Sequence, residues 1–166
     1  VFKRLYSYIK KTRTTNSLIY VAGDIVHSKT DMSPELINVV SDFFKKLADI
    51  APTIVITGNH DCNLNNSYRL DALSPIVKAL NHQNLHYLKD NGIYSISGVH
   101  FNVMSVFDKP VDYIKADDFD GDYKIALHHG SVHNASTDAG FTLSNTHVTT
   151  DIFAGHDLTL LGDIHK

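Results

Sequence analysis

The fold is decided by the stretch Thr53-Ile54-Val55-Ile56-Thr57-Gly58-Asn59-His60-Asp61, in which an apolar run passes through a glycine into three polar side chains. The β-branched run predicts a buried strand, because such side chains pack well on a covered, pleated surface. Asn59, His60 and Asp61 then follow at the carboxyl end of this strand. The alternative interpretation of these three residues is an ordinary polar turn.

The same plan of an apolar run, a break and then Asp or His occurs at three other places: Val21-Ala22-Gly23-Asp24, Ala126-Leu127-His128-His129-Gly130 and Leu160-Leu161-Gly162-Asp163-Ile164-His165. Ligands of α/β folds bind at the carboxyl ends of strands, so we expect these four clusters to meet. Taken singly, Asp24 is also typical of a turn or a helix cap, and the other two clusters of a polar strand end. Asp157 precedes its strand, and we interpret it as a turn residue.

Composition indicates a globular domain with a sizeable core. The chain has 166 residues, of which 43% are hydrophobic and 20% charged, which argues against disorder. The net charge of −3 gives no global attraction for nucleic acid. A single cysteine, Cys62, excludes an internal disulfide and leads us to expect an intracellular, cytoplasmic protein. We interpret Cys62 as a packed thiol, with a redox role as the alternative.

The elements expected from periodicity alternate between helix and strand. Residues 1–13 predict a basic amphipathic helix, and Ser33-Pro34-Glu35 opens a second helix whose apolar face runs to Ile50. A further helix starts at Ser74-Pro75. The expected strands cover residues 18–22, 53–57, 85–88, 93–106 as a hairpin, 123–127 and 158–161. This order predicts an α/β protein with a mixed sheet or two sheets.

The side chains of the four clusters suit hard or borderline divalent metals. Carboxylates, an amide oxygen and imidazoles, with no thiolate among them, fit Mn²⁺, Fe²⁺ or Zn²⁺, with Mg²⁺ as an alternative. Two such ions activate a water and offset the charge that develops on phosphorus. His60 is the expected proton donor, and Asp61 is expected to orient it. The sequence therefore predicts a phosphoester hydrolase.

These motifs, in this order, resemble the calcineurin-like metallophosphoesterases, over residues 18–166. Within that superfamily the chain is most similar to the SbcD-type DNA double-strand-break repair nucleases. Three features carry the finer resemblance: Gly23-Asp24-Ile25-Val26 with the Ser33-Pro34 helix start, Leu127-His128-His129-Gly130, and Leu161-Gly162-Asp163-Ile164-His165-Lys166. The resemblance implies a four-layer α/β/β/α sandwich that lacks its first strand here. It also implies one catalytic domain, residues 1–166, truncated at both ends.

The resemblance assigns roles to individual residues. Asp24 would bridge two metal ions, most consistently Mn²⁺, with Asn59, His128 and Asp163 on the second ion. His165 would hold the first ion, while His60 and Asp61 would be catalytic. His129 and Lys166 would contact substrate. The partners implied are DNA, an SMC-like ATPase of the SbcC type and a second copy of the chain, with no membrane.

Two departures from the family pattern affect the metals. The family's first motif, an Asp-x-His that supplies two ligands to the first ion, is absent, which predicts a weak first site. The family's last motif usually reads Gly-His-x-His, and here Asp163 takes the place of the first histidine. A carboxylate at that position is a harder ligand, which favours Mn²⁺ or Mg²⁺ over Zn²⁺.

Two other functions compete with a DNA nuclease. One is a phosphatase or phosphodiesterase of the same superfamily that acts on nucleotides or phosphoproteins, since fold and metals would be shared. The other is a structural module with an inactive site. A DNA substrate requires a basic surface, and the net charge of −3 does not indicate one.

Overall fold

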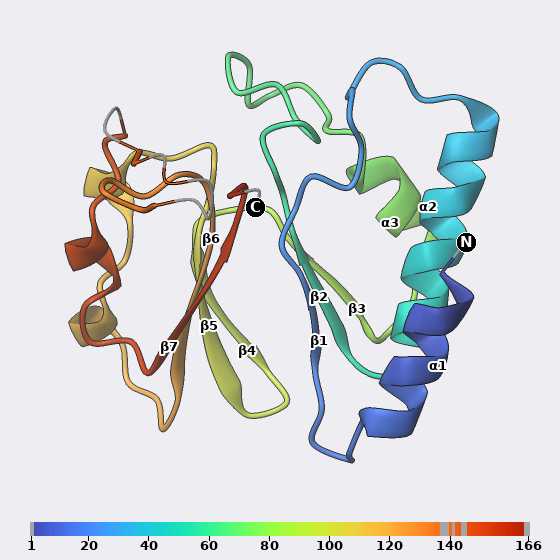
Figure 1. Ribbon diagram of the computed structural model, residues 1–166, viewed down its shortest axis with the longest axis horizontal. Coiled ribbons are helices and arrows are strands. Elements are labelled where there is room, and N and C mark those ends of the chain that lie inside the picture. Colours follow the sequence, from blue (N-terminus) through green and yellow to red (C-terminus); the bar gives the residue numbers. More distant parts are fainter. Residues whose placement is uncertain (1, 137–139, 141, 144–145, 165–166) are drawn as a thin grey trace. The chain divides into compact units, whose positions relative to one another are not determined.

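The computed structural model describes residues 2–136, 140, 142–143 and 146–164 (Figure 1). They form two compact units. The first consists of Val1–Val21, Ile25–Val55 and His60–Tyr87, and the second of Ala22–Asp24, Ile56–Asn59 and Leu88–Lys166. Among the helices of the described residues, none has both the length and the apolar character that crossing a bilayer requires.

The first unit carries a three-stranded sheet with helices. Its strands are β1 (Ile19–Val21), β2 (Thr53–Ile56) and β3 (Leu85–Leu88), in the order β1-β2-β3, and β1 runs parallel to β2. Its helices are α1 (Lys3–Thr12), α2 (Pro34–Ala48) and α3 (Ser74–Leu80). Ser33 caps α2 as predicted, because its hydroxyl accepts a bond from the N–H of Leu36 at 3.2 Å.

The core of the first unit joins α2 and α3 to the sheet. Val40 and Phe44 of α2 pack with Val55 of β2, Ile76 of α3 and Leu85 of β3. All four residues of β2 are buried, which explains their continuous apolar run. Cys62 is also buried and forms no disulfide, in agreement with a packed thiol.

The second unit contains a mixed four-stranded sheet in the order β4-β5-β6-β7. Its strands are β4 (Gly92–Ile96), β5 (Val99–Met104), β6 (Lys124–His129) and β7 (Leu158–Gly162). The β4–β5 pair is an antiparallel hairpin, whereas β5, β6 and β7 are parallel. Three short 3₁₀ helices complete the unit: η1 (Pro110–Asp112), η2 (Ala116–Asp118) and η3 (Thr150–Phe153).

Most of the predicted elements are present, and the mixed α/β class is confirmed. Two sheets with helices are the components expected of a metallophosphoesterase sandwich. One boundary differs in a way that matters: β6 extends to His129, whereas the sequence predicted a strand that ends at Leu127. His128 and His129 are therefore the last two residues of a strand, and their side chains point to opposite faces of the sheet.

Asp157 acts as a turn residue, as predicted. Its carboxylate accepts a hydrogen bond from the N–H of Lys124 at 2.7 Å, and its own N–H donates to the Lys124 carbonyl. The side chain of Asp157 therefore joins the start of β7 to the start of β6 and is engaged in local structure.

Candidate metal centre

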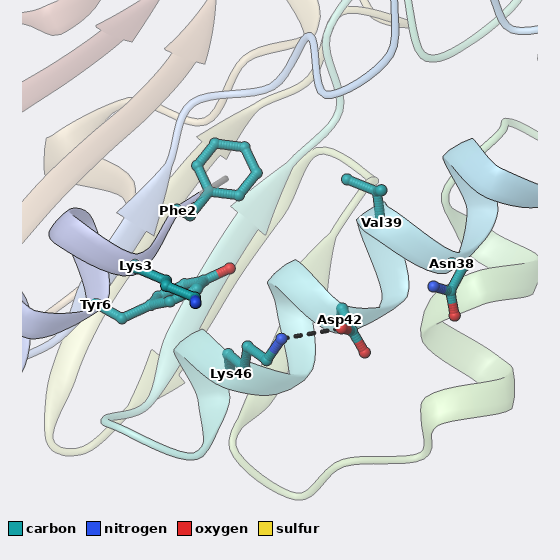
Figure 2. Close-up of a pocket in the computed structure, with 7 residues that line it drawn as sticks. All are labelled: Phe2, Lys3, Tyr6, Asn38, Val39, Asp42 and Lys46. Atoms are coloured by element: carbon teal, nitrogen blue, oxygen red, sulfur yellow. Dashed lines mark hydrogen bonds and ion pairs between the residues drawn. The ribbon is translucent and has the colours of Figure 1, made fainter.

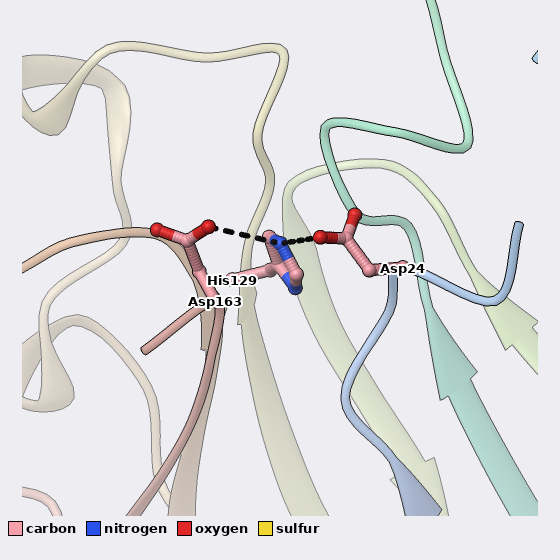
Figure 3. Close-up of side chains that lie close together, drawn as sticks. All are labelled: Asp24, His129 and Asp163. Carbon is pink, nitrogen blue, oxygen red and sulfur yellow. Dashed lines mark ion pairs between the residues drawn. The ribbon is translucent and has the colours of Figure 1, made fainter. Parts of the chain in front are cut away.

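Three metal-ligating side chains meet in the second unit: Asp24, His129 and Asp163 (Figure 3). Asp24 follows β1 in the chain, His129 is the last residue of β6, and Asp163 follows β7. One donor atom from each lies within 4.8 Å of the others. Residues more than a hundred positions apart in the sequence thus provide an imidazole and two carboxylates at one place.

The ring of His129 is held in one orientation by the main chain. It is 3% exposed, and its Nδ1 lies 2.6 Å from the carbonyl oxygen of Ala22. Because a carbonyl oxygen only accepts, Nδ1 carries a hydrogen, and Nε2 is the ring atom directed toward the other side chains of the cluster. Metal-ligating histidines are commonly oriented by such a bond to the other ring nitrogen.

Acceptor atoms surround Nε2 of His129. It lies 3.0 Å from Oδ1 of Asn59, 3.3 Å from Oδ2 of Asp24 and 3.9 Å from Oδ1 of Asp163. Two carboxylates, an amide oxygen and an imidazole nitrogen are thus gathered around one point. Oxygen and imidazole nitrogen donors are those that hard and borderline divalent ions prefer. The residues present therefore fit a divalent cation.

Ser131 orients the carboxylate of Asp163. The Ser131 hydroxyl donates to Oδ2 of Asp163 at 2.9 Å, and the other oxygen, Oδ1, is the one that lies toward His129. Asp163 has a φ of 82° and Asp24 a φ of 54°, both in the left-handed region that residues other than glycine seldom adopt. Such backbone costs about 1–3 kcal/mol and is concentrated at functional sites.

Glycines let the segments of the centre approach closely. A Cβ on Gly162 would lie 2.7 Å from Nδ1 of His129, and a Cβ on Gly23 would lie 2.7 Å from the same atom. Gly23 also has a φ of 83°. A side chain at either position would displace Nδ1 of His129 and break its hydrogen bond to the Ala22 carbonyl, so glycine is required at both.

Comparison with known proteins agrees with this centre. A family model of the calcineurin-like phosphoesterases matches residues 1–166. The chain belongs to the calcineurin-like phosphoesterase family. Members of this family hydrolyse phosphoesters with divalent metals, and the cluster around His129 provides a candidate site for such ions.

A viral protein is similar over the whole chain. It is the uncharacterized protein R555 of Acanthamoeba polyphaga mimivirus, which is 46% identical over 178 aligned positions. The alignment covers 100% of this chain and 13% of the viral protein, so the chain spans about an eighth of that relative's length. The activity, substrate and partners of the whole protein are therefore a matter for proposal.

His128, which was predicted as a metal ligand, lies outside the cluster of Asp24, His129 and Asp163. On the opposite face of β6, its Nδ1 donates to the carbonyl oxygen of Met104 at 2.9 Å, and its ring packs against Tyr113 and Phe153. The prediction assigned His128 to the metal and His129 to substrate. In the structure it is His129 that lies beside Asp24 and Asp163, because β6 continues to this residue, and the assignment of the metal ligand stays a prediction.

The surroundings of His128 disfavour a charged ring. Burial lowers its pKa, an effect that the nearby His129 increases and that the Met104 carbonyl and Asp163 oppose. Its Nε2 is buried without a hydrogen-bond partner among the described residues. His128 is therefore a neutral core histidine on the apolar side of the sheet.

His60 and Asp61 belong to the first unit of the phosphoesterase. Nδ1 of His60 lies 2.9 Å from the carbonyl oxygen of His27, and the two imidazole rings stack at 5.5 Å. Asp61 is fully buried, and one of its oxygens accepts from the N–H groups of Ile25 and Val26 at 2.9 and 3.1 Å. Their catalytic roles stay predictions.

The remaining predicted site residues, His165 and Lys166, lie outside the described residues. Sequence reasoning missed two participants, Ser131 and the carbonyl of Ala22. A main-chain carbonyl leaves no trace in residue type, and a serine after a strand is common in turns. The one signal available was that Ser131 follows directly on the His128-His129-Gly130 motif.

Proposed function

We propose that the protein hydrolyses phosphodiester bonds of DNA with divalent ions held by Asp24, Asn59, His129 and Asp163. The convergence of oxygen donors on Nε2 of His129 supports this proposal most directly, because these donor types are the ones that divalent cations bind. When bound, such ions polarise phosphate oxygens and activate water for attack on phosphorus. The likeness of the sequence motifs to SbcD-type nucleases supports DNA as the substrate.

Different side chains of the chain would bind the cation and orient its ligands. His129, held by Ala22, and Asp163, held by Ser131, would present donor atoms that need no rearrangement when a cation binds. Asn59 and Asp24 would complete the oxygen donors. A proton-donor role for His60 rests on the sequence motif alone.

Mn²⁺ or Mg²⁺ is proposed as the metal in preference to Zn²⁺. The structure-based donor set contains two carboxylates, one amide oxygen and only one imidazole, a balance that suits harder ions. By the same resemblance to SbcD-type nucleases, we propose an SMC-like ATPase and a second copy of the chain as partners.

A three-substrate assay tests the proposed function. Linear duplex DNA, bis(p-nitrophenyl) phosphate and p-nitrophenyl phosphate are each incubated with the protein and Mn²⁺, and Asp163→Asn is the matched control because it preserves shape while removing a charge. We expect cleavage of DNA and of the diester that chelation abolishes and that Asp163→Asn lowers by about 100-fold or more. Cleavage of the monoester alone would identify a phosphatase instead.

A calorimetric titration with Mn²⁺ completes the test. If Mn²⁺ binds and none of the three substrates is cleaved, the domain is a structural module. If Mn²⁺ binds equally to the protein and to Asp163→Asn, Asp163 is not a ligand and the proposed centre is wrong.

A further inference from the structure

Positive charge is segregated at the start of the chain. Residues 1–23 contain five bases and no acidic residue, the first being Asp24. The remainder carries 10 bases and 18 acids, a net charge of −8. The overall value of −3 therefore conceals a local excess of five positive charges: Lys3, Arg4, Lys10, Lys11 and Arg13.

Helix α1 carries this charge on several sides, and Lys3 and Lys10 border its contact with α2, because they line a cavity together with Lys46 and Asp49. Its apolar side meets α2 through Phe2 and Tyr6, whose rings lie 4.8 and 6.4 Å from that of Phe43. Lys3 and Lys10 are seven residues apart, and so are Arg4 and Lys11, which places each pair on one side of the helix about two turns apart. All four are exposed. We call these four residues and Arg13 the α1 basic face.

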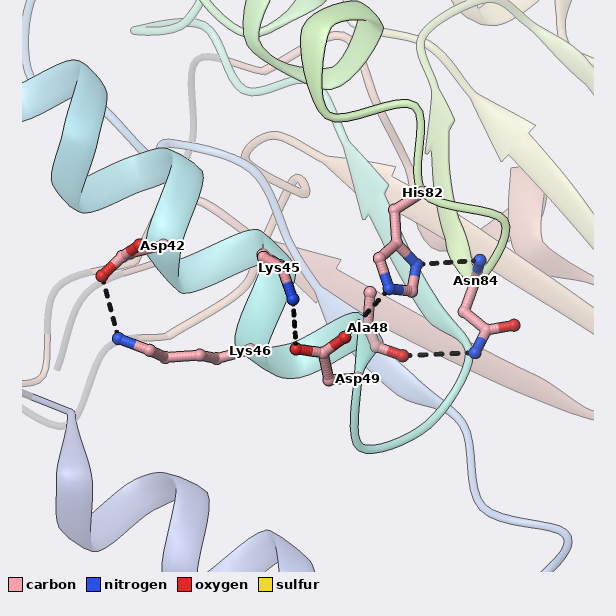
Figure 4. Close-up of polar contacts among 7 residues, drawn as sticks. All are labelled: Asp42, Lys45, Lys46, Ala48, Asp49, His82 and Asn84. Atoms are coloured by element: carbon pink, nitrogen blue, oxygen red, sulfur yellow. Dashed lines mark hydrogen bonds and ion pairs between the residues drawn. The ribbon is translucent and has the colours of Figure 1, made fainter.

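The charge of the α1 basic face is not neutralised within its unit. Among the described residues, none of its five side chains takes part in an ion pair or hydrogen bond. Neighbouring lysines of α2 differ: Lys45 pairs with Asp49 at 2.8 Å and Lys46 with Asp42 at 2.9 Å (Figure 4). The α2 surface is thus locally balanced, whereas α1 offers free positive charge.

Hydroxyl donors accompany these lysines. Lys3 and Lys10 line a cavity of about 380 Å³ with Tyr6 and Ser7, and also with Lys46 and Asp49. The Asp49 carboxylate pairs with Lys45 at 2.8 Å, so the ammonium groups of Lys3 and Lys10 and the hydroxyls of Tyr6 and Ser7 remain as donors for a phosphate. On the other side of Tyr6, a second cavity of about 290 Å³ lies between the start of α1 and α2, with Lys3 beside the Tyr6 ring (Figure 2). Positive charge with hydroxyl donors is the chemistry that contacts a sugar–phosphate backbone.

We propose that the α1 basic face binds the backbone of duplex DNA without regard to sequence. The two rows of bases span roughly 10 Å along the helix at 1.5 Å per residue, and a duplex offers about one phosphate charge per 1.7 Å of its axis. Several phosphates therefore fall within reach at once. The choice of DNA as the polyanion rests on the proposed function, while the binding surface rests on α1 alone.

Fluorescence anisotropy with a labelled 20-base-pair duplex in EDTA tests this surface without cleavage. The double variant Lys3→Gln/Lys10→Gln is compared with Lys78→Gln/Lys109→Gln, which removes the same charge from exposed positions elsewhere. Each lost phosphate contact flattens the slope of log K against log salt by about 0.9. We expect the α1 variant to flatten it by about 1.8 and to bind about tenfold or more weakly at 0.1 M salt, and the control to match the wild type.

Three outcomes would overturn the inference: equal slopes for both variants, no DNA binding by the wild type, or binding only to vesicles that contain phosphatidylserine. The inference and the proposed function fail separately. Salt-dependent binding through α1 without cleavage in Mn²⁺ would refute the function alone, and cleavage with an unchanged slope would refute the α1 basic face alone.

Discussion

His128 and His129 are neighbours in the chain with equal burial and similar main-chain partners, yet their surroundings differ completely. Each is 3% exposed, and each donates from Nδ1 to a main-chain carbonyl, of Met104 and Ala22 respectively. Nε2 of His129 faces carboxylates, whereas the ring of His128 contacts Tyr113 and Phe153. The comparison shows that burial and an oriented ring are shared by both histidines, and that only His129 presents its second nitrogen to groups that could bind a metal ion with it.

The difference follows from strand geometry. Successive side chains of β6 point to opposite faces, so one histidine must lie on each. One side of the sheet carries a small apolar cluster of Met104, Tyr113 and Ala126 with Ile152 and Phe153 of η3. The segments that bring Asp24 and Asn59 into the second unit lie against the other histidine.

Replacing each histidine in turn should give the largest effects, on metal affinity in one case and on stability in the other. His129→Ala is expected to weaken Mn²⁺ binding by about 100-fold or more, because it removes a ligand atom and not only an orienting group. His128→Ala is expected to keep metal affinity while lowering the free energy of unfolding by about 2–4 kcal/mol, because it leaves a cavity in a packed core. Calorimetric Mn²⁺ titration and urea unfolding measure the two effects.

The opposite pattern would restore the original prediction. If His128→Ala lost the metal and His129→Ala did not, the ligand would be His128 and the described geometry would not be the metal-binding one. Unfolding of the metal-free proteins is the control, since it separates lost affinity from lost structure.

Removing the Ser131 hydroxyl should have a smaller effect on metal affinity than removing His129. Ser131→Ala frees Oδ2 of Asp163 to rotate, and orienting groups of this kind are typically worth 10–100-fold in metal affinity. Ser131→Thr retains the hydroxyl and is expected to retain affinity. Equal Mn²⁺ affinities for the alanine variant and the wild type would show that Asp163 needs no orientation.

On the apolar side of the sheet, the titration of Tyr113 should make the stability of the protein depend on pH. Burial, followed by the charges of Asp108 and Asp112, raises the pKa of Tyr113 to about 12. Its unfolded value is near 10. The neutral hydroxyl therefore contributes stability that is complete below pH 10 and is lost as the pH rises toward 12.

Tyr113→Phe should cost about 1 kcal/mol at pH 8, where the hydroxyl donates to the carbonyls of Ser105 and Asp108 at 3.2 and 3.4 Å. Between pH 10 and 12 the variant should lose less stability than the wild type. Thermal unfolding over this range measures the difference, and parallel pH profiles would show that Tyr113 does not titrate in the folded state.

Local sequence signals predicted the elements well because each was carried by neighbours in the chain. Ser33-Pro34-Glu35 fixed the start of α2, and the β-branched run of residues 53–56 fixed β2. Asp24, Asn59 and Asp163 were predicted for a similar reason, since each follows a break directly after an apolar run, and the structure brings all three close to His129. The confirmed family also shows that the order of these motifs carried real information.

The sequence did not show which of the two adjacent histidines, His128 or His129, faces Asp24 and Asp163. Two identical residue types stand side by side, and an extension of β6 by two residues determines which face each one takes. Strand ends depend on pairing with neighbours, here of Met104 with His128 and of Gly162 with His129, which no local pattern specifies. The orienting partners, Ser131 and the Ala22 carbonyl, depend on long-range contacts in the same way.

The crowding around the His129 ring makes residues without any donor atom as indispensable as the ligands. Gly162 and Gly23 contribute only their lack of a side chain, yet a methyl group on either would push the imidazole away from its carbonyl partner. Substitution at these two positions should therefore be tolerated as poorly as loss of Asp24 or Asp163. A search for similar centres in other genomes would find more of them by scoring the space left empty next to a ligand as well as the ligand itself.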